Sequence, residues 1–121
     1  MIIYNLTQHA LTEEQRKDGI LELPAALSER VKGLLNFEAM PWQDEVQARA
    51  EQLAVLALEV CADGVMLGGA PFLMSALVAQ MKQRGIRTFF AFSQRRSREV
   101  QIAGNTVEKR SIFCYEGLIE V

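Results

Sequence analysis

The sequence predicts a three-layer α/β protein: a mostly parallel sheet with helices on both faces and a β-hairpin at the C-terminal end. Short apolar runs alternate with amphipathic segments as far as Phe92, and this alternation is typical of parallel strands joined by helical crossovers. Beyond Ser93, apolar residues flank Gly104-Asn105, which is suited to a two-residue hairpin turn. The hairpin would add an antiparallel edge to the sheet.

The first elements are a strand, a short helix and a second strand. The apolar run at residues 2–6 predicts a central strand, which is followed by a polar loop. Thr12 and Gln15 have the spacing of a capping box, and Gly19 is suited to end the helix that this box begins. A second strand is expected at residues 20–23, just before a proline.

The middle of the chain predicts helices with a strand between them. Apolar residues recur at helical spacing over residues 27–35 and 42–61, which indicates two amphipathic helices. A buried strand follows at residues 65–67 and leads into a helix with an apolar stripe over residues 73–81. The fourth strand is expected at residues 86–92.

Length and composition fit one domain spanning residues 1–121. The chain has a mass of 13.6 kDa, 50% apolar residues and a net charge of −2, so neither a disordered protein nor a duplex-DNA binder is expected. No leader or membrane segment is visible at the N-terminus, and a cytoplasmic protein is expected. Cys61 and Cys114 stand among apolar residues as buried free thiols. Trp42 is most simply a core residue, with a dimer surface as the alternative. No metal or cofactor is expected, because no matching motif is present.

The segment from Gly64 to Phe72 is the most informative part of the chain. It predicts a buried strand that turns through Gly68 and Gly69 into a helix with Pro71 in its first turn. Free backbone N–H groups at such a helix start favour an anion. The spacing matches neither the dinucleotide-binding fingerprint nor the P-loop. A turn that merely reverses the chain is an equally open interpretation.

Three loops are expected to meet at the carboxyl ends of the strands, where ligands bind in open α/β sheets. They are residues 5–9, 68–72 and 93–96, and their polar groups suit a phosphorylated ligand. His9 is the only histidine and a candidate general acid or base, although a solitary histidine is more often structural. Arg95, with Arg96 beside it, is a candidate phosphate clamp, the alternative being a solvated strand edge.

Several segments resemble a group of small CRISPR-associated proteins with a Rossmann-like fold, related to CARF proteins. Some of these are proposed as ring nucleases that degrade cyclic oligoadenylate messengers. The resemblance covers the opening strand and its loop, residues 11–15, the middle strand and its helix, and residues 91–96 and 107–113. The polar segment after the fourth strand and the basic hairpin are its most specific part.

The resemblance implies a homodimer whose two-fold axis brings both sets of loops onto one symmetric ligand. Cleavage would need no metal, because the messenger's own 2′-hydroxyl attacks the neighbouring phosphorus. His9 and Arg95 would then be the catalytic residues. The implied binding groups are Asn5, Thr7, Gln8, Gly68, Gly69, Ser93 and Gln94. The first two loops lack a lysine, and this absence weakens the expectation of catalysis more than the expectation of binding.

The resemblance therefore implies a protein that binds a cyclic oligoadenylate or a related nucleotide messenger in type III CRISPR signalling. If the protein is an enzyme, it would cleave this messenger without a metal. Two alternatives stay open. One is a non-catalytic homodimer that senses nucleotides or binds another protein, and the other is a small domain that binds a phosphorylated metabolite. No membrane partner is expected.

Overall fold

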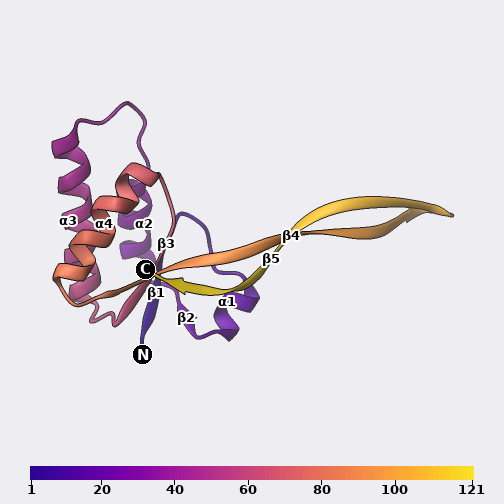
Figure 1. Cartoon of the computed structure of the whole chain (residues 1–121), viewed down its shortest axis with the longest axis horizontal. Helices are drawn as coiled ribbons and strands as arrows, with labels where there is room; N and C mark the ends of the chain where they lie inside the picture. Colours follow the sequence, from indigo (N-terminus) through magenta and orange to yellow (C-terminus); the bar gives the residue numbers. More distant parts are fainter.

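A computed structural model describes residues 1–121 and contains one sheet with the strand order β2-β1-β3-β4-β5 (Figure 1). The strands are β1 (Ile3–Leu6), β2 (Ile20–Leu21), β3 (Gly64–Leu67), β4 (Arg87–Ala103) and β5 (Thr106–Glu120). The helices are α1 (Glu13–Lys17), α2 (Ala25–Leu35), α3 (Gln43–Glu59) and α4 (Pro71–Gln83). The first four strands pair in parallel and β5 is antiparallel to β4. The mixed α/β class and the C-terminal hairpin are therefore confirmed.

The main core lies between one face of the sheet and α2, α3 and α4. Leu6 of β1 and Val65 and Leu67 of β3 point into this core, in keeping with the alternation of side chains along a strand. The helices contribute their apolar stripes, which include Val31, Leu53 and Leu77. None of the helices combines the length and apolar character needed to cross a membrane.

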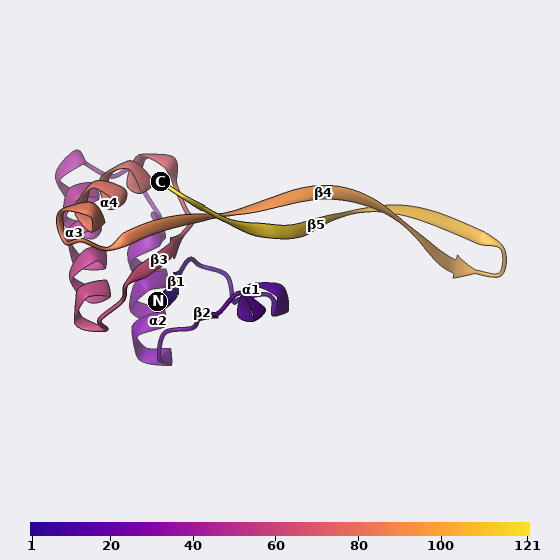
Figure 2. The same cartoon turned by 60° about the horizontal axis from the view of Figure 1, so that its bottom comes forward.

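The opposite face carries a much thinner layer. Its only helix is α1, which begins with the expected capping box of Thr12 and Gln15 but buries none of its side chains. A separate cluster of Leu11, Ile20 and Met66 covers this face. Helices thus lie on both faces, but very unequally (Figure 2).

Two residues expected in the core lie outside it. Trp42 caps the start of α3 instead of lying within the helix, and 84% of its surface is exposed. Cys61 follows the end of α3 with a left-handed φ of 56° and is also exposed. Their predicted burial was wrong because the helical stripe ends before either residue is reached.

The fourth strand is longer than predicted. It was expected to end at Phe92, but β4 continues to Ala103 and pairs with β5 nearly residue for residue up to the turn at Gly104-Asn105. Residues 93–115, which we call the arm, form a two-stranded ribbon that extends far beyond the helices (Figures 1 and 2). Both faces of this ribbon are solvated, so the apolar residues on either side of the turn predict the hairpin but not how far it extends beyond the sheet.

Tyr115 anchors the base of the arm to α1. Its hydroxyl donates a hydrogen bond of 2.8 Å to Oδ2 of Asp18, the C-cap residue of α1. Burial raises the pKa of Tyr115 above its ordinary value of 10.0, and the hydrogen bond to Asp18 and the charge of Asp18 raise it further.

This anchor can be tested by titrating the phenol. In a Tyr4→Phe variant, Tyr115 is the only tyrosine, and we expect its phenolate absorbance to appear clearly above pH 10. Because the pKa is higher in the folded than in the unfolded chain, the stabilising contribution is complete below pH 10 and is lost as the pH rises through the folded value. Adding Asp18→Asn should bring the midpoint closer to 10. An ordinary midpoint in the Tyr4→Phe variant would contradict the contact.

Candidate functional site

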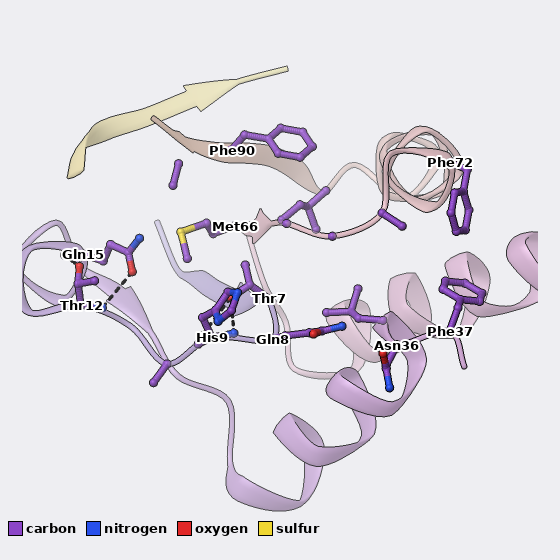
Figure 3. A pocket seen from close by; sticks show the side chains of 17 residues that line it. Thr7, Gln8, His9, Thr12, Gln15, Asn36, Phe37, Met66, Phe72 and Phe90 are labelled. Carbon is purple, nitrogen blue, oxygen red and sulfur yellow. Dashed lines mark hydrogen bonds between the residues drawn. The ribbon is translucent and has the colours of Figure 1, made fainter. Parts of the chain in front are cut away.

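An open pocket of about 770 Å³ lies at the carboxyl ends of β1 and β3, beside Phe90 and Ala91 of β4 (Figure 3). The loop after β1 forms one side, and the glycine turn with the start of α4 forms another. Two of the three expected loops therefore meet, because parallel strands end at the same edge of the sheet. The lining residues are Thr7, Gln8, His9, Ala10, Thr12, Gln15, Leu35, Asn36, Phe37, Met66, Leu67, Gly68, Gly69, Ala70, Phe72, Phe90 and Ala91.

Asn5 holds the first loop in place from beneath. Its side-chain Nδ2 donates to the backbone oxygen of His9 at 2.8 Å and to Oε1 of Glu22 at 2.7 Å. Its Oδ1 accepts from the backbone N–H of Thr7 at 3.0 Å and from the Thr7 hydroxyl at 2.7 Å. Asn5 is only 7% exposed and its hydrogen-bonding capacity is filled. It was expected to bind ligand, but the structure makes it a positioning residue.

Glycine is required where the two loops approach each other. A Cβ at Gly68 would lie 3.3 Å from Cγ2 of Thr7, so the glycine allows the turn to pack directly on the first loop. Gly69 has a φ of +156°, and a Cβ there would lie 3.2 Å from Cε of Met74. Because neither glycine carries a Cβ, the backbone of the turn can pack closely and form part of the pocket wall.

The start of α4 presents unpaired donors to this pocket. Ala70 is the N-cap, without a side-chain cap, and Pro71 occupies the first turn as predicted. The N–H groups of Gly69, Ala70 and Phe72 have no hydrogen-bond acceptor within the protein. Such groups carry the partial positive charge of the helix N-terminus and favour an anion.

Phe37 and Phe72 form an aromatic wall that the sequence did not indicate. Their rings meet edge to face, with centroids 5.2 Å apart and planes at 63°. The guanidinium of Arg49 lies 4.2 Å from the centroid of Phe37 and donates to the backbone oxygens of Leu34 at 3.3 Å and Asn36 at 2.6 Å. Arg49 thus satisfies carbonyls at the end of α2 and fixes the aromatic wall at the same time.

The lining contains no Lys, Arg, Asp or Glu, and His9 supplies its only imidazole. Neither ring nitrogen of His9 has a hydrogen-bond partner in the protein, whereas its backbone is held by Asn5 and Thr7. The imidazole is therefore free to exchange a proton with a ligand. No group of three or more His, Cys, Asp or Glu residues is placed to hold a metal ion.

The third expected loop does not exist. Ser93, Gln94 and Arg95 lie in the arm as part of β4, and β4 contributes Phe90 and Ala91 to the pocket instead. The Arg95 guanidinium lies 5.2 Å from the ring centroid of Phe113 on the neighbouring strand. These three residues are therefore not brought to the pocket of their own chain.

We expect Asn5→Ala to lower the free energy of unfolding by about 1 to 3 kcal/mol, because it leaves polar groups of the first loop without a partner. Urea unfolding followed by circular dichroism measures this effect. Gln8→Ala is the matched control: this neighbouring side chain is exposed and makes no hydrogen bond, so its effect should stay within about 0.5 kcal/mol. Equal unfolding midpoints for the two variants would show that Asn5 does not hold the loop.

No curated protein and no solved structure matches this chain. The model of one family, described as the Uncharacterized protein MJ1673 family, matches residues 1–118. The matched span includes the pocket and the whole arm. Because the match covers nearly the full length of the chain, the protein belongs to the Uncharacterized protein MJ1673 family.

Proposed function

We propose that the pocket binds a cyclic oligoadenylate messenger. The observation that carries this proposal is the combination of unpaired backbone N–H groups, an aromatic wall and one free imidazole in a pocket without other charges. These are the groups that a phosphodiester, a purine base and a transferred proton require.

The phosphate would lie at the start of α4. The N–H groups of Ala70 and Phe72 can donate to its oxygens, and the partial positive charge of the helix start compensates for the missing Lys and Arg. Gly68 and Gly69 let the phosphate approach the backbone closely. The methyl group of Thr7 lies against Gly68 on the other side of the turn, while its hydroxyl is hydrogen-bonded to Asn5 and to the backbone of His9.

The base would lie against Phe72, whose ring is held by Phe37. Phe72 is 51% exposed, so one face can receive a purine. Asn36 and Gln15 also line the pocket and carry amides that can recognise the edge of a base. The cavity of about 770 Å³ suits a ligand on the order of one or two nucleotides. A larger cyclic oligonucleotide would therefore extend out of the pocket.

Cleavage of the ring would proceed without a metal. The 2′-oxygen of one nucleotide forms a bond to the adjacent phosphorus, the bond from phosphorus to the 5′-oxygen breaks, and a 2′,3′-cyclic phosphate is left. The 2′-hydroxyl loses its proton to water in the open pocket, and the leaving 5′-oxygen gains one. His9 would donate the second proton, since it is the lining side chain suited to this task.

Binding without cleavage is the second candidate function. It is favoured by the imidazole of His9, which no side chain orients. A general acid normally has such a partner. In that case the protein would sense or sequester the messenger.

The phosphate site can be tested by removing one N–H. Ala70 has φ −59° and ψ 130°, values that proline adopts, so Ala70→Pro deletes the donor while keeping the backbone conformation. We expect it to weaken binding of cyclic tetra- or hexa-adenylate about 10- to 100-fold, corresponding to one charge-assisted hydrogen bond of about 1.5 to 3 kcal/mol. Isothermal titration calorimetry gives the dissociation constants, and Ala70→Val, which keeps the N–H and adds no capping oxygen, should bind like the wild type. If the wild type binds neither ring, the proposed function is wrong.

The role of His9 can be tested on turnover. With a chelator present, we expect His9→Ala to slow the release of linear product by about 10² to 10⁴-fold and to leave the affinity nearly unchanged. Chromatography of the reaction measures the product, and Arg30→Ala, at an exposed position outside the pocket, serves as the control. Binding by the wild type without product would select the non-catalytic alternative.

A further inference from the structure

The arm lacks a surface to pack on within its own chain. From Ser93 to Phe113 every side chain is exposed except Val100, which is half-buried. Phe113 alone is 70% exposed, and Ile102, Val107 and Ile112 are exposed as well. An isolated two-stranded ribbon is only marginally stable in water, and its free edges invite pairing. The arm therefore requires a partner.

The charge of the arm points to the kind of partner. Residues 93–115 hold five Lys or Arg and two Glu, a net charge of +3, whereas the rest of the chain holds eight basic and thirteen acidic residues, a net charge of −5. Arg98 and Arg110 lie directly opposite each other in the ladder, where like charges repel. Glu108 compensates Arg110 at 3.2 Å, but Arg98 has no acidic partner. An acidic surface with apolar side chains would complement the arm.

The body of the same protein offers such a surface. A groove of about 460 Å³ is lined by Met40, Pro41, Gln43, Val46, Gln47 and Phe72. Met40 is 96% exposed and neighbours the exposed Trp42, and the acidic residues Glu38 and Asp44 stand on either side of this pair in the sequence. Phe72 lines both this groove and the candidate site, so the two lie next to each other.

We propose that the arm of one copy docks in the Met40–Phe72 groove of a second copy, and that the second copy does the same in return. The arm points away from α2, α3 and α4 of its own chain in both views, so it cannot occupy its own groove (Figures 1 and 2). Reciprocal docking gives a closed two-fold dimer and leaves no arm unpaired. The exposed apolar residues of the arm then cover Met40 and Trp42, and its arginines face the acidic body.

The docked arm also brings Arg95, Arg96 or Arg98 beside a pocket that has no cation of its own. The role of these guanidinium groups at the pocket rests on the proposed function. The docking of the arm does not, because it requires no ligand. Each site would then combine backbone donors from one copy with guanidinium groups from the other.

Trp42 reports on this contact because it is the only tryptophan. Without ligand, we expect light scattering at micromolar concentration to give twice the chain mass of 13.6 kDa, and Trp42 to be shielded from acrylamide with blue-shifted emission. A variant in which Asn-Gly replaces residues 94–114 should be monomeric, with a red-shifted and quenchable Trp42. Its core is intact, because no residue of the removed segment is buried.

A charge variant tests the same contact with the arm kept. Arg98→Glu combined with Arg110→Glu should lower the mass to that of one chain and expose Trp42. Lys17→Glu combined with Arg30→Glu changes the net charge equally at exposed body positions and should remain dimeric. The proposal is overturned if the wild type is monomeric, or if the dimer survives both arm variants. If the monomeric wild type binds single-stranded RNA and loses this binding when the arm is removed, the arm is a nucleic-acid element instead. None of these outcomes depends on binding of a cyclic oligoadenylate.

Discussion

The parallel register of β1, β3 and β4 is the constraint on which the rest of the structure depends. Leu6 pairs with Leu67, and Leu67 pairs with Phe90, so the three strands reach the same edge of the sheet together. The chain leaves this edge into the first loop, into the glycine turn and into the arm. Segments far apart in the sequence therefore meet at the pocket because their strands point in one direction.

The uneven cover of the sheet follows from the order of its strands. The connections from β2 to β3 and from β3 to β4 progress in the same direction along the sheet, and right-handed crossovers place their helices on the same face. The connection from β1 to β2 runs the other way and places α1 on the opposite face. That face therefore carries α1, the Leu11, Ile20 and Met66 cluster and the anchor at Tyr115.

The candidate chemistry is divided between two parts of the molecule. The pocket offers backbone donors, aromatic rings and His9, but no Lys or Arg. The arm carries five of the eight Lys and Arg residues of the last third of the chain, and it begins right beside this pocket, after Phe90 and Ala91. A ligand with several phosphates would favour bringing the two together, and the proposed dimer does so without bending the arm back onto its own chain.

The sequence by itself determined the elements and the place of the first two loops. Apolar periodicity, the capping box at Thr12 and the glycine turn before Pro71 are local signals, and the structure follows each of them. Periodicity also located the turn of the hairpin at Gly104-Asn105. These features could be predicted because they depend on neighbours a few residues away.

Only the tertiary structure decided what the polar residues do. Asn5 was a plausible ligand-binding residue until its amide was found saturated by groups that include Glu22 on a distant segment. Phe37 and Phe72 form a wall because α2 and α4 end and begin side by side, and Arg95 leaves the site because β4 continues. A polar side chain has the same local signature whether it faces a ligand, a buried partner or solvent, and only long-range packing separates these cases.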